Sequence, residues 1–178
     1  STRPSQPSFD TPSPSRTTTA DQLSVLTAVR GGKSVFFTGG AGTGKTFLFQ
    51  TLVSELRAMH GGSSVLVVSP TDAGACAVHG LTLNALFGTN FDQTTVKALH
   101  LRIVHHAEMK QLLQNIRALV LDDVSQFTVE SFEKLSTALR QIRSSTLPFG
   151  GLQIVCTGDF VQNPPRGQTQ CVFDAAVW

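Results

Sequence analysis

The sequence predicts an α/β fold in which a doubly wound parallel sheet is covered by helices on both faces. Three observations lead to this fold class. Short apolar runs alternate along the chain with segments of helical apolar spacing. Each run is continuously apolar, which is typical of strands buried on both faces of a parallel sheet. The 178 residues and the hydrophobic fraction of 40% are enough for one domain with a core.

The first half of the predicted domain holds two helices and two strands. Apolar residues recur at helical spacing in residues 21–30 and again beyond a glycine-rich loop, until Gly61-Gly62 ends the second helix. The apolar runs at residues 34–38 and 64–69 are predicted to be buried strands. The order of these elements is therefore helix, strand, helix, strand.

The second half repeats this alternation. We expect residues 94–116 to be helical and residues 118–121 to form the third strand. An apolar stripe then runs along residues 129–142, with Thr128 as the N-cap of that helix. Residues 152–157 complete the set as a fourth strand. We find no internal repeat.

Residues 1–19 differ in composition from the remainder of the chain. They are mostly Ser, Thr and Pro with a single aromatic residue. Such a segment cannot bury enough apolar surface to offset the entropy lost on ordering. We therefore expect a disordered tail or linker over residues 1–19 and one domain over residues 20–178.

Charge and cysteine usage restrict the class of protein. The net charge of +2 is too small to indicate nucleic acid or a membrane as the partner by itself. Cys76, Cys156 and Cys171 are far apart in the sequence and lack Cys-x-x-Cys spacing. We expect buried, reduced thiols in an intracellular protein that is not secreted. Because no apolar run approaches the ~18–20 residues of a membrane span, we expect no membrane contact.

A glycine-rich stretch follows the first predicted strand and opens a helix. The letters GGAGTGKT match the pattern G-x-x-x-x-G-K-[ST], whose backbone N–H groups turn toward phosphate oxygens. Lys45 is expected to reach the β- and γ-phosphates, and the Thr46 hydroxyl is expected to bind Mg²⁺. The predicted phosphate-binding residues are Gly39, Gly40, Ala41, Gly42, Thr43, Gly44, Lys45 and Thr46.

Two adjacent carboxylates follow the third predicted strand in the stretch LVLDDVSQ. Asp122 lies at the carboxyl end of the strand, where ligands bind in such sheets, and is predicted to be a second Mg²⁺ ligand. An Asp buried there without a partner would be costly. Asp123 has two roles open to it. It orients the attacking water, or it merely caps the following turn, and the residues alone leave these alternatives about evenly balanced.

The fourth predicted strand is followed by the stretch TGDFVQNPPRG. Gln162 is predicted to orient water or touch the γ-phosphate, and Asp159 to set the conformation of the loop. The alternative is a generic proline-rich turn without a catalytic role.

Taken in order, these segments resemble the petite-integration-frequency (PIF) family of DNA helicases, in the RecD-like branch of superfamily 1. The resemblance runs from about residue 20 to Trp178. ADQ, ending at Gln22, is similar to the Q motif, and FFTGGAGTGKT to motif I. SPTDAGACAVHGLTLNALFG is similar to the motif that lies along single-stranded DNA. LVLDDVSQ stands where the family has Asp-Glu-Ile-Ser-Met, and GDFVQNPP where it has Gly-Asp-Phe-x-Gln-Leu-Pro-Pro. FEKLSTALRQIRSSTLPFGG resembles the family's signature stretch.

The resemblance implies a RecA-like P-loop NTPase domain, the first of two, in a 5′→3′ DNA helicase that uses ATP and Mg²⁺. It implies that Gln22 reads the adenine and that Thr71, Thr82 and Asn84 lie along single-stranded DNA. It also implies action on DNA junctions in genome maintenance (telomeres, replication, repair and recombination), in the nucleus or mitochondrion. We expect a monomer. The second domain supplies an arginine worth ~10³–10⁵ in rate and is expected to be absent here, so this chain alone should be nearly inactive.

The departures from the family pattern lie close to the expected sites. Asp72 replaces a glycine beside the expected DNA path, and Asn84 stands where histidine is common. Gln126 replaces methionine, Asn163 replaces leucine, and Asp123 replaces glutamate. These changes leave a second hypothesis open, a divergent nucleotide-binding scaffold that has lost efficient ATP hydrolysis.

Overall fold

A four-stranded parallel sheet forms the centre of the protein. The computed structural model describes residues 18–40, 42–159 and 172–176. The strand order is β1-β4-β3-β2, and every neighbouring pair is parallel. The strands are β1 (Val35–Phe37), β2 (Val65–Val68), β3 (Ala118–Leu121) and β4 (Gln153–Thr157). The order in space differs from the order in sequence, as the predicted doubly wound α/β fold requires.

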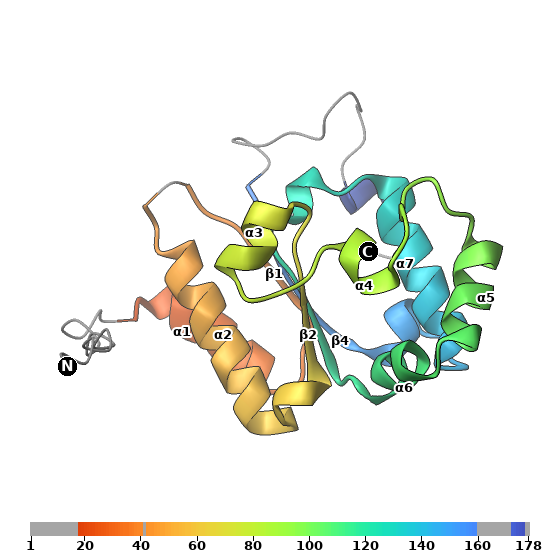
Figure 1. Cartoon of the computed structure of the whole chain (residues 1–178). Helices are drawn as coiled ribbons and strands as arrows, with labels where there is room; N and C mark the ends of the chain where they lie inside the picture. The colour runs from red at the N-terminus through yellow and green to blue at the C-terminus, as the bar shows by residue number, and fades with distance from the viewer. Residues whose placement is uncertain (1–17, 41, 160–171, 177–178) are drawn as a thin grey trace, which may run out of the picture.

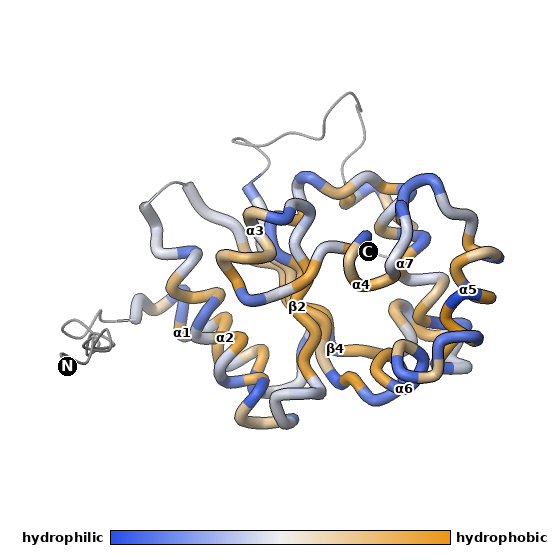
Figure 2. Tube along the Cα trace, viewed as in Figure 1, coloured by the Kyte–Doolittle hydropathy of each residue, from blue (hydrophilic) through white to orange (hydrophobic). Residues whose placement is uncertain are grey.

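Helices cover both faces of the sheet (Figure 1). One face is covered by α1 (Ala20–Arg30) and α2 (Lys45–His60), and the other by α5 (Val96–His105), α6 (Ala107–Asn115) and α7 (Val129–Ile142). Figure 2 shows the strands as a hydrophobic band between these two layers. Short elements, which the sequence analysis did not predict, complete the described part: α3 (Asp72–Ala77), α4 (Leu83–Phe87), and the 3₁₀ turns η1 (Gly62–Ser64), η2 (Val124–Gln126), η3 (Pro148–Gly151) and η4 (Val172–Asp174).

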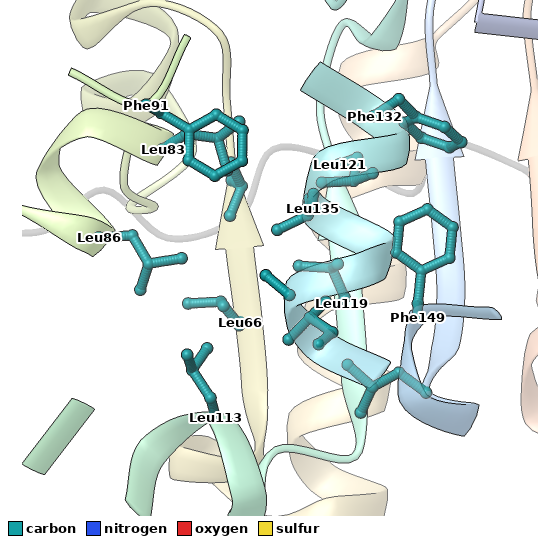
Figure 3. Packing of buried hydrophobic residues seen from close by; sticks show 14 of the residues in the cluster. Leu66, Leu83, Leu86, Phe91, Leu113, Leu119, Leu121, Phe132, Leu135 and Phe149 are labelled. Carbon is teal, nitrogen blue, oxygen red and sulfur yellow. The ribbon is translucent and has the colours of Figure 1, made fainter. Parts of the chain in front are cut away.

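The pleat of β3 divides the core into two clusters. Leu119 and Leu121 lie in the larger cluster together with Leu135 of α7, as Figure 3 shows. Ala118 and Val120, which alternate with them, belong to the smaller cluster under α1 and α2. A shift of one residue in the pairing would exchange these faces, so the pattern fixes the register and with it the position of the carboxylates that follow β3.

The helical character expected for residues 94–116 is confirmed, but it is provided by two helices. The segment is divided at His106, whose backbone is extended (φ −113°, ψ 91°), into α5 and α6. An unbroken helix of that length would span about 35 Å, whereas strands of four or five residues span about 13–17 Å. The break keeps Leu99 of α5 and Leu113 of α6 in the same buried cluster and returns the chain to the start of β3.

The described part of the chain bears on two further expectations. Cys156 is buried in β4, and burial raises the pKa of its thiol to about 12, but Cys76 is exposed, against the expectation. Cys171 lies outside the described residues. None of the described helices is both long enough and apolar enough to cross a membrane.

The first helix, α1, begins at Ala20. The Thr19 side chain accepts a hydrogen bond from the backbone N–H of Gln22 and so caps α1. Residues 1–17 lie outside the described residues, so the tail over residues 1–19 stays a prediction.

Candidate nucleotide-binding site

The glycine-rich loop joins β1 to α2 and presents the first turn of that helix to the carboxyl edge of the sheet. Gly44, the N-cap of α2, has left-handed backbone angles (φ 85°, ψ 18°) and makes no side-chain cap. The N–H groups of the first turn therefore keep their capacity to bind an anion. A Cβ at this position would also lie 3.0 Å from Nε2 of Gln22. Ala41 lies outside the described residues.

Gln22 connects α1 to this loop. Its Oε1 accepts from the Thr19 backbone N–H at 3.1 Å, and its Nε2 donates to the Thr43 carbonyl oxygen at 3.3 Å. The Thr43 hydroxyl in turn donates to the carbonyl oxygen of Gly40 at 2.9 Å. The structure thus places Gln22 against the phosphate loop, and it adds an anchoring role that the sequence analysis did not predict.

Lys45 lies across the loop and reaches the end of β4. Its ammonium group donates to the carbonyl oxygens of Gly39 and, at 3.2 Å, Gly40. It also forms an ion pair with Asp159, in which Nζ and Oδ2 are 3.2 Å apart. Asp159 is only 8% exposed, so this ion pair is partly shielded from water. Three acceptors therefore hold the lysine at the place where phosphate oxygens are expected.

A cleft of about 250 Å³ lies over this edge of the sheet. The site residues that line it are Lys45, Thr46, Asp122, Asp123 and Asp159. Thr46 and Asp122 bring a hydroxyl and a carboxylate to the same cleft, and such oxygen ligands suit Mg²⁺. Within the described ranges, no three His, Cys, Asp or Glu side chains gather as a metal site. The donor set thus fits a cation that completes its shell with water and nucleotide phosphates.

Asp122 lies half-buried directly after β3. Its backbone N–H donates to the Val68 carbonyl oxygen at 2.8 Å, which ties it to the end of β2. Burial raises the pKa of its carboxyl group, and the neighbouring charge of Asp123 raises that pKa further, while hydrogen bonds from the Asp123 backbone and the Ser69 side chain oppose the rise. A divalent cation would stabilise the ionised form, so the raised pKa fits a metal ligand.

Asp122→Asn should stabilise the nucleotide-free protein at neutral pH. A carboxyl group whose pKa is raised on folding makes its most favourable contribution below its unfolded pKa of about 3.9 and loses it as the pH rises through the folded value. The neutral amide of the variant does not ionise and so does not lose this stability. The thermal midpoint of Asp122→Asn at pH 7 should therefore exceed that of the parent. Thermal unfolding at pH 7 and pH 3.5 would measure this, and an equal gain at both pH values would contradict the electrostatic explanation.

Asp123 has a conformation that the sequence analysis did not predict. Its backbone is left-handed (φ 45°, ψ 51°), which Asp tolerates better than most residues. Its carboxylate accepts a hydrogen bond from the Ser125 hydroxyl at 2.6 Å and another from the side-chain amide of Gln126. Asp123 is the N-cap residue of η2, but its side chain makes no capping bond to the backbone of that turn. The residue therefore lines the cleft while its carboxylate is bonded within the turn.

The residues expected along DNA lie in the segment between β2 and α5. The Thr71 and Thr82 hydroxyls accept from backbone N–H groups, each at 3.1 Å, and cap α3 and α4. Asn84 accepts at Oδ1 from the Phe91 N–H at 2.8 Å. Thr82 and Asn84 line a second pocket of about 100 Å³ that Gln126 also lines. Gln162 and Asn163 lie outside the described residues, so the role expected of Gln162 stays a prediction.

Known proteins similar to this chain are helicases. A family model described as "PIF1-like helicase" matches residues 17–175. The ATP-dependent DNA helicase PIF1 of Saccharomyces cerevisiae is 31% identical over 163 residues, which are 89% of this chain and 19% of that protein. The Danio rerio protein of the same name is 36% identical over 145 residues, 82% of this chain and 22% of that protein. The chain therefore spans about a fifth of the length of these relatives.

Solved structures of Pif1 helicases are also similar to this chain. The crystal structure of Pif1 helicase from Candida albicans has a TM-score of 0.83 at 31% identity and covers 90% of this chain and 37% of that one. Bacteroides Pif1 in complex with ADP-AlF3 and ssDNA has a TM-score of 0.74 at 26% identity. The match covers 92% of this chain and 40% of the Bacteroides chain. The second of these was solved with a nucleotide analogue and with single-stranded DNA.

Proposed function

This chain belongs to the PIF1-like helicase family, and we propose that it is the first, ATP-binding half of an ATP-dependent DNA helicase. One observation carries the proposal. The phosphate loop, the Thr46 hydroxyl and the carboxylates of Asp122 and Asp123 converge on one cleft at the carboxyl edge of a RecA-like sheet. This set contains the parts that phosphoryl transfer requires, namely a phosphate cradle, metal ligands and a residue to position water.

Each part has a definite task in the proposed reaction. The loop amides and Lys45 bind the β- and γ-phosphates and hold them in line with the attacking water. Thr46 and Asp122 would hold Mg²⁺, which supplies positive charge next to the phosphates. Asp123 would orient the water, and Gln162 would contact the γ-phosphate. Gln22 lies against the loop, where it can support the phosphate site and meet the adenine.

On the DNA side, we propose that Thr71, Thr82 and Asn84 face single-stranded DNA, with translocation in the 5′→3′ direction. The single-stranded DNA bound in the Bacteroides Pif1 complex supports DNA as the partner. A second RecA-like domain would complete the ATP site and supply the arginine of the transition state. We place the complete protein, as a monomer, at DNA junctions in telomere maintenance, replication, repair and recombination, in the nucleus or mitochondrion.

The alternative function is a nucleotide-binding scaffold without efficient hydrolysis. The short side chain of Asp123 and its bonds within the turn favour this alternative. ATP turnover by the full-length protein, measured with and without an oligo-dT strand, distinguishes a helicase from a scaffold. A helicase should hydrolyse ATP faster when DNA is present, whereas a scaffold should show no turnover under either condition.

Asp72→Gly should strengthen the binding of single-stranded DNA. Asp72 is an exposed carboxylate in the first turn of α3, next to the expected DNA contact Thr71, and it would repel phosphates there. We expect a gain of about threefold or more at low salt that shrinks as salt rises, because screening weakens the repulsion. Fluorescence anisotropy with labelled oligo-dT measures this gain.

Two controls accompany that variant. Asp72→Asn removes the charge without the added freedom of glycine and should give a similar gain. Glu108→Gln removes an exposed charge on α6 and should change nothing. If Asp72→Gly and Asp72→Asn both leave affinity unchanged at low salt, Asp72 lies away from the DNA.

A further inference from the structure

The side chain of Gln126 lies between the two pockets described above. It lines the small pocket on the DNA side, together with Thr82 and Asn84. Its amide donates a hydrogen bond to Oδ2 of Asp123, a residue that lines the nucleotide cleft. One side chain thus connects the wall of one pocket with a carboxylate of the other.

The remainder of the turn is held firmly. Val124 and Ser125 are fully buried, and a Cβ added to Gly158, at the end of β4, would lie 3.1 Å from the Ser125 backbone nitrogen. Such a close approach leaves the backbone of η2 little room to move. Gln126 is only half-buried and has a long side chain, so its amide is the part of this turn that can change partners.

Two side chains of the turn bond to the Asp123 carboxylate. Oδ1 accepts from the Ser125 hydroxyl at 2.6 Å, and Oδ2 accepts from the Gln126 amide. A carboxylate that orients an attacking water must offer it an oxygen. Without the bond from Gln126, the carboxylate would be held less firmly within the turn and could direct Oδ2 toward a water in the cleft. The acceptor that takes the amide in exchange must enter the pocket that Gln126 lines.

We propose that Gln126 is a positioning residue that couples DNA binding to the Asp123 carboxylate. Without DNA, its amide holds Asp123 within the turn. When single-stranded DNA occupies the pocket of Thr82 and Asn84, a phosphate or base oxygen takes the amide over and releases Oδ2 toward the cleft. The exchange replaces the hydrogen bond between the Gln126 amide and Asp123 by a hydrogen bond between the same amide and the DNA. Because one bond is lost and one is gained, a modest affinity for DNA is enough to shift the equilibrium. This inference rests on the function proposed above.

Nuclear magnetic resonance on the 178-residue chain tests the exchange directly. The side-chain NH₂ signals of Gln126 are identified by their absence in Gln126→Met, a change that keeps the length of the side chain but removes the amide. Addition of oligo-dT should shift these signals, and the Asp123→Asn variant without DNA should show them already shifted. Signals from Gln111, which is exposed on α6, should stay in place. DNA binding that leaves the Gln126 signals unmoved would overturn the inference.

Kinetics of the full-length protein supply the second test. Gln126→Met should raise ATP turnover without DNA by about tenfold, which corresponds to one charge-assisted hydrogen bond, and leave turnover at saturating oligo-dT within about twofold. The stimulation by DNA should fall by the same factor. In an Asp123→Asn background, Gln126→Met should have no effect on turnover. Gln111→Met is the matched control and should behave as the parent does.

The outcomes separate this inference from the proposed function. Equal loss of turnover with and without DNA in Gln126→Met would mean that Gln126 serves the fold alone, and the coupling would be overturned although the helicase function stands. Absence of any nucleotide or DNA binding by the parent would overturn both. An undiminished DNA stimulation in Gln126→Met would overturn the coupling alone.

Discussion

Lys45→Ala should abolish the binding of Mg-ATP and Mg-ADP by this chain, with a loss of affinity of ~30-fold or more. The lysine is half-buried at the glycine-rich loop and lines the cleft, where its positive charge would attract phosphate oxygens. Truncating one partner of a buried charge pair costs about 2–5 kcal/mol, which corresponds to a loss of this size. Isothermal titration calorimetry with both nucleotides measures it.

The ion pair of Lys45 with Asp159 requires a structural control for this experiment. Lys45→Ala removes that ion pair and two hydrogen bonds to loop carbonyl oxygens, so the thermal midpoint of the variant must be compared with that of the parent. Lys33→Ala, which removes an exposed lysine before β1, should bind nucleotide as the parent does. Equal affinity of Lys45→Ala and the parent would mean that GGAGTGKT is only a structural turn.

The main elements of the fold could be predicted because burial dominates them. Residues 118–121 are continuously apolar, and they form β3 in the centre of the sheet with both faces covered. The N-cap predicted at Thr128 is also confirmed, since a hydroxyl before an apolar stripe is a local signal. The break between α5 and α6 at His106 could not be predicted in this way, because neither glycine nor proline occurs there. The packing of the two helices against the sheet determines the position of the break.

The candidate site was predictable only in part. The phosphate loop and Asp122 lie together at the sheet edge because parallel strands bring their carboxyl ends to one edge. The ion pair between Lys45 and Asp159 joins residues 114 positions apart, so no local pattern could reveal it. The contact of Gln126 with Asp123 depends on the left-handed backbone at Asp123, which the letters DDVSQ do not show.

We expect Asp123, in the turn after β3, to limit the rate of ATP hydrolysis. Asp is one CH₂ shorter than Glu, so its oxygens fall about 1.5 Å short of the place a glutamate would reach. A misplacement near ~1 Å can cost ~10²-fold, whereas a well-positioned base contributes ~10²–10⁴-fold. The bonds to Ser125 and Gln126 draw the carboxylate further toward the turn. We therefore expect slow hydrolysis by the full-length protein rather than none.

Asp123→Glu should raise the DNA-stimulated kcat of the full-length protein by about tenfold or more, with little change in KM. A higher kcat at unchanged KM is expected when a variant stabilises the transition state without changing substrate binding. The left-handed backbone at this position suits Asp better than Glu, so the same variant should unfold at a slightly lower temperature. Asp123→Asn, which keeps the size but removes the charge, should lower kcat below that of the parent. If the glutamate leaves kcat unchanged and the asparagine is harmless, Asp123 serves the turn alone and the hydrolytic role belongs to another residue.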